Sequence, residues 1–244
     1  MTWRWLTFSS VLLPLLAGTS APPARAGNVT GTVELANSSD PATRRNHNYS
    51  GVVLWLEPVP RPASLPLVPK RATMEQRNKQ FVPHVLAVTV GSTVDFPNDD
   101  ELMHNVFSVA SGQVFDLLLY PKGTTRSVTF KYKGIARIYC QIHSTMSAII
   151  AVLDTPWFTV TPPSGKFVIP DVPAGDYVLH VFHERALPEN LAILQPRISV
   201  SEDGLTLPLI SISETGYVAA PHPDKHGQPY PVAPRYPASG GGGS

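Results

Sequence analysis

The chain has 244 residues, of which 43% are hydrophobic and 15% are charged, and its formal net charge is +1. This composition is sufficient for a sizeable core and excludes general disorder. No basic patch or aromatic-basic run stands out, so nothing indicates nucleic-acid binding. Long helical patterns are scarce, and short runs rich in Val, Ile, Thr and aromatic residues lie between Gly, Pro, Asn and Asp, which predicts an all-β fold.

The N-terminal residues 1–26 have the features of a secretory signal peptide. Arg4 supplies a positive charge, residues 6–17 form an apolar stretch too short to span a bilayer, and residues 24–26 (Ala-Arg-Ala) fit a cleavage site. Cleavage there removes two arginines and leaves 17 basic and 18 acidic residues. No other stretch is long and apolar enough to cross a bilayer. We therefore expect a periplasmic or secreted protein with no membrane span after signal removal.

Two strands are predicted near the start of the mature chain. Residues 29–35 (VTGTVEL) alternate between an apolar and a polar face, and residues 51–57 (GVVLWLE) form a second apolar run. The polar stretch between them is typical of a loop. Residues 58–69 are too rich in proline to lie inside a sheet, so we expect a linker or an extended edge there.

A dense block of short strands follows over residues 70–155 and could fold alone. The predicted strands cover residues 84–90, 93–96, 104–108, 127–132, 136–140 and 148–153. More strands are predicted between residues 157 and 212. Because two early strands are too few to be stable alone, we expect them to pair with these late strands, with the block inserted between. From residue 216 the chain is dense in Pro and Gly, which predicts a disordered tail over 216–244.

Cys140 is the only cysteine of the chain. A single thiol in an exported protein forms an intermolecular bridge, stays inert in a core or binds a metal. His143 and Met146 follow it at intervals of three residues, and His104 precedes it. One Cys and two His with a weak axial Met form a type 1 copper site, whereas zinc prefers tetrahedral sets without Met. The residues therefore predict one copper ion held by His104, Cys140, His143 and Met146.

The spacing of these residues is compatible with a single ion. We expect Cys140 to end one strand and Met146 to begin the next, with a five-residue loop between them, while His104 comes from the start of another strand. Three ligands on a short loop and one on the scaffold form a rigid set. Rigidity limits reorganisation between two oxidation states, as electron transfer requires.

Residues 80–154 resemble a cupredoxin domain of the amicyanin and plastocyanin type. The resemblance is carried by residues 94–108 (VDFPNDDELMHNVFS) and 139–152 (YCQIHSTMSAIIAV). It implies a Greek-key β-sandwich, and it implies that Asn105, next to His104, joins the two ligand loops by hydrogen bonds. Related short loops often place prolines beside the histidine, whereas this loop has none.

The flanking parts of the chain look like a carboxypeptidase-regulatory-like, transthyretin-like β-sandwich. Its pattern G-x-F-x-I-x-x-V-P-x-G-x-Y-x-L runs from Gly165 to Leu179. The expected organisation is a cupredoxin domain at 70–155 inserted into a sandwich made of 27–69 and 156–215. The arrangement is similar to exported proteins labelled methylamine-utilisation-like.

Other polar residues have simpler interpretations. His84 is expected to be a surface or capping residue, and the residues 99–101 (DDE) a solvated turn that could instead dock a basic partner. His180 and His183 are predicted on opposite faces of a strand, which makes them poor joint ligands. The histidines of the tail, His222 and His226, are expected to be incidental.

Enzymatic copper chemistry is not expected from this sequence. A multicopper oxidase needs H-x-H pairs, a binuclear site needs two cysteines, and neither is present, nor is a G-x-S-x-G nucleophile motif. The sequence thus predicts a non-enzymatic, one-electron transfer protein that meets an unidentified redox partner protein at His143. The alternatives are a non-redox copper-binding module and a cell-surface interaction module without metal.

Overall fold

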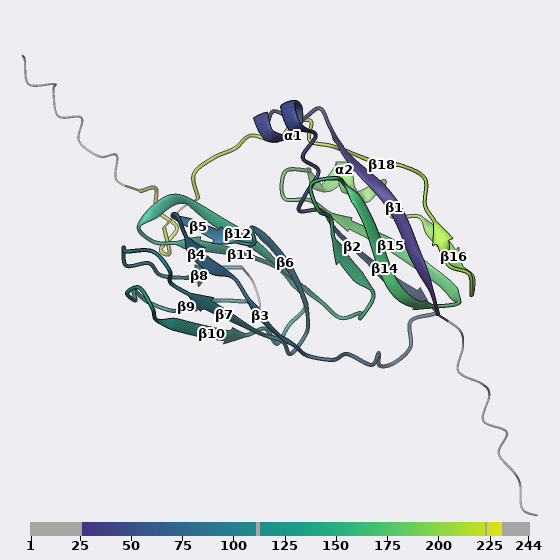
Figure 1. Cartoon of the computed structure of the whole chain (residues 1–244), viewed down its shortest axis with the longest axis horizontal. Helices are drawn as coiled ribbons and strands as arrows, with labels where there is room; N and C mark the ends of the chain where they lie inside the picture. The colour runs from purple at the N-terminus through teal and green to yellow at the C-terminus, as the bar shows by residue number, and fades with distance from the viewer. Residues whose placement is uncertain (1–25, 111–112, 223, 231–244) are drawn as a thin grey trace, which may run out of the picture.

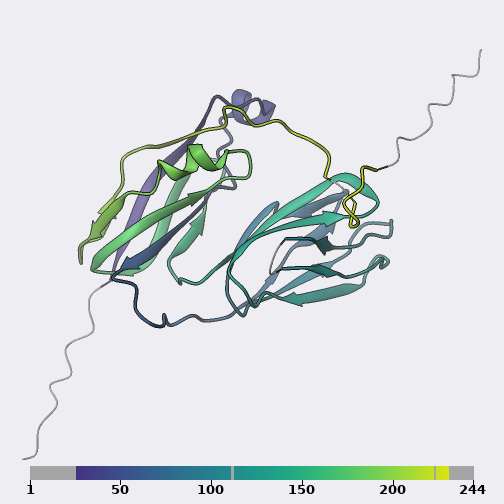
Figure 2. The same ribbon diagram turned by 180° about the vertical axis from the view of Figure 1, so that it is seen from behind.

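The structure, a computed structural model, describes residues 26–110, 113–222 and 224–230. Within them the regular elements are β-strands apart from two short helices, so the all-β prediction is confirmed. The strands form two lobes that lie side by side (Figures 1 and 2). The predicted signal peptide lies outside the described residues except for Ala26. No helix in the described parts of the chain has the length and apolar character of a membrane span.

The sandwich lobe is formed by strands from both ends of the chain. One sheet contains β1 (Ala26–Ala36), β14 (Lys166–Pro173), β17 (Leu205–Thr206) and β18 (Ile210–Ser213). The other contains β13 (Phe158–Val160), β2 (Val53–Val59), β15 (Gly175–Phe182) and β16 (Arg197–Val200). The helices α1 (Pro41–Asn46) and α2 (Pro188–Ala192) connect these strands.

The core of the sandwich lobe follows from strand alternation. On β1 the side chains of Val29, Val33 and Leu35 are buried, and they pack with Phe167 and Ile169 of β14. The two strands pair antiparallel, so their inward side chains meet on one face. The early strands are therefore stabilised by late ones.

The central lobe is formed by the strands between residues 71 and 153. One sheet has the order β10 (Thr125–Thr129), β7 (Thr93–Pro97) and β3 (Arg71–Thr73). The other has the order β6 (Val85–Thr89), β12 (His143–Leu153), β11 (Gly134–Cys140), β8 (Phe107–Ser108) and β9 (Phe115–Asp116). A separate hairpin of β4 (Glu75–Arg77) and β5 (Gln80–Val82) completes the central lobe. This lobe has its own core cluster.

Strand β12 is buried on both faces. Its residues Ile150 and Val152 lie in the core of the central lobe, whereas Ile149 and Ala151 belong to a separate apolar cluster. That cluster includes Val53 of β2, in the sandwich lobe, and therefore joins the two lobes. Burial of both faces explains why residues 148–153 are continuously apolar rather than alternating.

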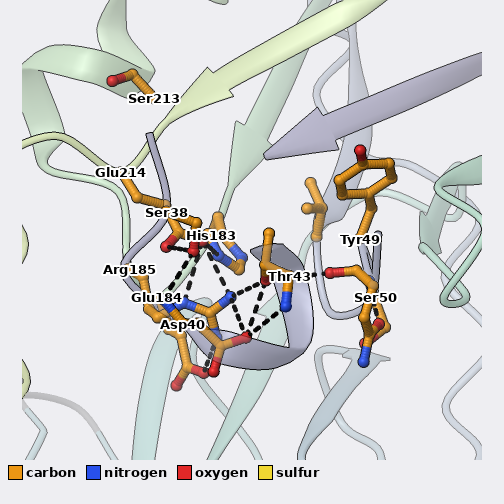
Figure 3. Close-up of polar contacts among 12 residues, drawn as sticks. Ser38, Asp40, Thr43, Tyr49, Ser50, His183, Glu184, Arg185, Ser213 and Glu214 are labelled. Carbon is orange, nitrogen blue, oxygen red and sulfur yellow. Dashed lines mark hydrogen bonds and ion pairs between the residues drawn. The ribbon is translucent and has the colours of Figure 1, made fainter. Parts of the chain in front are cut away.

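A buried polar cluster lies beside this apolar contact, where β15 ends (Figure 3). The carboxylate of Glu214 accepts hydrogen bonds from His183 Nε2 at 2.9 Å, from Arg185 Nε at 3.0 Å and from the Ser38 hydroxyl at 2.6 Å. Arg185 also donates to the hydroxyl of Thr43, on α1. The adjacent Glu184 pairs with His84 of the central lobe at 2.7 Å. These polar contacts thus join the early and late segments of the sandwich lobe to each other and, through Glu184 and His84, to the central lobe.

The local structure differs from the predictions at His104 and in the C-terminal tail. The strand expected over 104–108 is reduced to Phe107–Ser108, because His104 instead forms an isolated bridge in which its N–H and C=O bond the backbone of Tyr120. The tail was expected to be disordered from residue 216, yet residues 217–222 and 224–230 contact the central lobe, for example through Tyr230. Pro and Gly content does not prevent docking where side chains reach fixed partners. Residues 223 and 231–244 lie outside the described residues.

Candidate metal centre

Three of the four predicted ligands bring their donor atoms together at one end of the central lobe. The Sγ atom of Cys140 lies 3.6 Å from Nδ1 of His104 and 3.8 Å from Nδ1 of His143. One donor atom from each residue lies within 4.8 Å of the other two. The rings of His104 and His143 have centroids 4.9 Å apart. Among the described residues, this is the one group of three or more His, Cys, Asp or Glu with this geometry.

The separations match those of donors that share a metal ion. A thiolate at about 2.3 Å and an imidazole nitrogen at about 2.1 Å from an ion, with an angle of about 110–120° between them, lie about 3.6–3.8 Å apart. Both sulfur–nitrogen distances fall in this range. The residues present therefore fit a single mononuclear ion, and their donor types suit copper.

Cys140 and His143 are held by a hairpin with a two-residue turn rather than by the predicted five-residue loop. Cys140 is the last residue of β11 and His143 is the first of β12, and the two residues pair directly. The register shifts between Tyr139 and Cys140, so that only Gln141 and Ile142 form the turn. The expected five-residue loop was wrong because β12 extends backward to His143. This extension fixes the backbone of both ligands through strand pairing.

Met146 lies inside β12, not at its beginning. Its side chain is 1% exposed and belongs to the same core cluster as Cys140. The strand period places Met146 on the same face as Ala148 and Ile150, which are also in this core. The thioether is therefore buried in the interior of the lobe that holds the other three residues.

His104 is oriented by Asp100, whose role the sequence interpretation missed. The Nε2 atom of His104 lies 2.8 Å from Asp100 Oδ2, and the carboxylate also accepts bonds from the backbone N–H groups of Asn78 and Lys79. A proton on Nε2 leaves the lone pair of Nδ1 available to a metal. Asp100 is thus not part of a merely solvated turn. Its position four residues before His104 was the signal available in the sequence.

Asn105 connects the two segments that carry ligands. Its Oδ1 atom accepts a hydrogen bond from the backbone N–H of Gln141 at 2.5 Å, and its Nδ2 atom donates to Asp116 Oδ1 at 3.2 Å. Because Gln141 follows Cys140 directly, this bond ties the His104 segment to the hairpin. Asn105 is 2% exposed, so water does not compete for these bonds.

The electrostatic environment favours neutral imidazole at His143. Burial, followed by repulsion from His104 and Lys79, lowers the pKa of His143. Burial alone would raise the pKa of Asp100, but hydrogen bonds from Lys79, His104 and Asn78 outweigh it and lower the pKa. A neutral imidazole is the form that binds metal.

Access to the centre is uneven. His104 and Cys140 are fully buried, whereas His143 is partly exposed. Three other histidines pair with carboxylates elsewhere: His84 with Glu184, His180 with Glu57 and His183 with Glu214. His47 contacts the hydroxyl of Tyr49. His222 lies close to the centre, with Nε2 3.3 Å from the carbonyl oxygen of His143, so its interpretation as incidental is corrected.

No protein-family model matches this sequence, and no curated protein matches it. Among solved structures, it is similar to a purple cupredoxin from Nitrosopumilus maritimus, with 26% identity over 34% of this chain and 99% of that chain and a TM-score of 0.31. It is also similar to a copper-containing nitrite reductase from Thermus scotoductus, with 28% identity over 39% of this chain and 26% of that chain and a TM-score of 0.33. A Cu(I) amicyanin variant has 23% identity over 34% of this chain and 82% of that chain, with a TM-score of 0.33. These neighbours cover about a third of the chain.

Proposed function

We propose that the central lobe holds one type 1 copper ion and that the protein transfers single electrons without transforming a substrate. The observation that carries this proposal is the approach of two imidazole Nδ1 atoms to the buried thiol of Cys140, at 3.6 and 3.8 Å. A thiolate with two imidazoles is the equatorial set of a blue copper site, and buried Met146 is the candidate for the weak axial ligand. Copper, when bound, supplies a couple between Cu(I) and Cu(II).

The residues around the ligands prepare the site for this role. Asp100 holds His104 in the tautomer that offers Nδ1, and Asn105 ties its segment to the hairpin of Cys140 and His143. Strand pairing on β11 and β12 fixes the backbone of the hairpin. Ligands held by packing and hydrogen bonds keep their positions when the charge of the ion changes.

His143 is the proposed exit for the electron, because it is the partly exposed ligand. Apolar side chains are exposed on the segments next to the ligands, namely Leu102, Met103, Leu118, Leu119 and Ile142. Exposed apolar side chains near a functional group are typical of a protein interaction site. We propose that an unidentified redox partner protein docks there, in the periplasm or outside the cell.

For the sandwich lobe we propose a carboxypeptidase-regulatory-like, transthyretin-like domain that presents the copper domain. The methylamine-utilisation-like assignment remains part of this proposal. The alternative function is a copper-binding module without redox activity, which the same donor set would also support. A cell-surface interaction module without metal is the third candidate.

One titration separates these functions. Cu(II) is added to the purified full chain, and visible absorption and electron paramagnetic resonance are recorded. We expect an intense thiolate-to-copper band and narrow copper hyperfine splitting, together with reversible reduction at an electrode. A colourless product refutes the type 1 site. A coloured product whose copper cannot be reduced and reoxidised favours the non-redox module.

Two substitutions assign the ligands. Cys140→Ala removes the only thiol, so the band should disappear. Met146→Leu should keep the band and raise the reduction potential, because the loss of a thioether leaves the three equatorial donors in place. A band that persists in the Cys140 variant would contradict the assignment.

A further inference from the structure

The C-terminal segment of the chain lies against the ligand hairpin. After β18 the chain leaves the sandwich lobe and crosses to the far end of the central lobe, where its described part, in yellow in Figures 1 and 2, lies beside β11 and β12. We refer to residues 217–222 and 224–230 as the C-terminal segment. Its hydrogen bonds with the hairpin are partly buried.

Three residues of this segment bond the turn that separates the two ligands. The hydroxyl of Tyr230 donates to the carbonyl oxygen of Cys140 at 2.9 Å, and Nε2 of His222 lies 3.3 Å from the carbonyl oxygen of His143. Between them, the backbone N–H of Lys225 donates to Gln141 Oε1 at 3.0 Å. The segment therefore reaches Cys140, His143 and a residue of the turn between them.

The same segment joins the hydrogen-bond network of Asn105. The Nζ atom of Lys225 lies 2.7 Å from Asp116 Oδ2, and Asp116 Oδ1 accepts from Asn105. Asn105 in turn accepts from the backbone N–H of Gln141. These contacts form a closed ring that runs from the hairpin through the His104 segment to the tail and back to Gln141.

Aromatic packing anchors the segment. His222 is 8% exposed and stacks on Tyr139, with ring centroids 4.3 Å apart and planes at 23°. It also meets Phe107 at 6.2 Å and Tyr230 at 5.4 Å. Since Tyr139 directly precedes Cys140, burial of His222 fixes the start of the hairpin as well as its end.

Strand pairing of β11 with β12 and the hydrogen bond from Gln141 to Asn105 also hold the hairpin, and the contacts of the C-terminal segment add to them at its tip. Residues 140–146 (CQIHSTM) contain no proline that would fix a φ angle, and Ile142 at the turn is exposed. A mobile tip would let the sulfur and the Nδ1 atom of His143 separate.

We propose that the C-terminal segment is a clamp that holds Cys140 and His143 at their ligand separation, with His222 and Tyr230 as positioning residues. The clamp deepens the proposed copper function, because it acts on the same hairpin. The clamp itself is present without metal, since its bonds join protein atoms only. Its test can therefore be made on the metal-free protein.

The first experiment measures hydrogen exchange of the backbone amides of residues 141–146 in the metal-free full chain. In His222→Ala we expect these amides to exchange about tenfold faster, because a buried ring and a hydrogen bond are lost. His226→Ala is the matched control, since His226 is exposed in the same segment and only its backbone N–H is hydrogen-bonded within the segment. The amide of Ile150, deep in β12, reports whether the lobe is still folded.

Tyr230→Phe gives a milder test, because it keeps the ring and removes only the hydroxyl. We expect about fivefold faster exchange at the hairpin, as for the loss of one hydrogen bond. If both variants exchange like the unmodified chain while Ile150 stays protected, the segment is not a clamp and the proposal is overturned.

A second readout links the clamp to the metal and separates the two proposals. On the copper-loaded full chain, loss of copper to a chelator should be about tenfold faster in His222→Ala than in His226→Ala. Equal rates would overturn the role of the clamp at the metal. If the unmodified chain forms no thiolate-to-copper band at all, the copper function fails, whereas the exchange result still decides whether the clamp exists.

Discussion

Substitution of Glu214 by Gln should destabilise the sandwich lobe. Glu214 is 3% exposed, and its carboxylate accepts hydrogen bonds from His183, Arg185 and Ser38 (Figure 3). Gln has nearly the same shape, so the change removes charge rather than volume. It leaves Arg185 with only more distant carboxylates, 3.9 Å or farther from the guanidinium.

The magnitude follows from the pKa of Glu214. Burial alone would raise this pKa, but the hydrogen bonds from His183, Arg185 and Ser38 outweigh it and lower the pKa from 4.5 to about 2. One pKa unit corresponds to about 1.4 kcal/mol, so ionised Glu214 contributes about 3 kcal/mol to the free energy of unfolding at neutral pH.

The sign of the pH dependence is set by the lowered pKa. The contribution is complete above the unfolded-state pKa of 4.5 and is lost as the pH falls toward about 2. At pH 3 less than half of it, about 1.4 kcal/mol, should remain. The difference between the unmodified chain and Glu214→Gln should therefore narrow from pH 7 to pH 3.

Urea unfolding followed by tryptophan fluorescence measures this difference, because Trp55 and Trp157 lie in the sandwich lobe. Glu202→Gln is the matched control, since Glu202 is exposed in the same lobe, and it should change stability by less than about 0.5 kcal/mol. A Glu214→Gln variant that is as stable as the control at pH 7, or a difference that does not change with pH, would refute the reasoning.

Three further substitutions test other parts of the structure. Asp100→Asn should weaken copper binding about 10- to 100-fold in a competition titration, because Asn has no negative charge and one acceptor oxygen, whereas both Asp100 oxygens accept hydrogen bonds and one of them fixes the His104 tautomer. Exposed Asp99→Asn should not weaken it. Ile138→Ala should lower the free energy of unfolding of the central lobe by about 2–5 kcal/mol in urea, since Ile138 is fully buried, and Ile193→Ala, at 82% exposure, should have little effect. Gly165→Ala should destabilise the sandwich lobe by about 2 kcal/mol or more in the same urea assay. The reason is that Gly165 has a φ of +70° and that a Cβ there would lie 2.2 Å from a backbone carbonyl oxygen of β1. An unchanged urea midpoint would contradict this prediction.

Part of the metal centre could be predicted because it depends on short-range chemistry. The types and spacing of Cys140, His143 and Met146 are visible in one stretch of sequence, and alternation on β11 indicated which residues face the core. The position of Asp100 was visible too, yet its role was not, because a carboxylate in a turn has many possible partners. Only the fold brings the backbone N–H groups of Asn78 and Lys79 to it.

By itself, the sequence determined the strand content, the proline-rich break after the early strands and the identity of the candidate ligands. These features depend on periodicity, backbone restriction and donor chemistry, all of which are local. The tertiary structure alone decided that β12 is buried on both faces, that β12 begins at His143 and that the C-terminal segment returns to Cys140. Contacts such as that between Tyr230 and Cys140, which are 90 positions apart, carry no local pattern, since they form only when the two lobes and the tail meet.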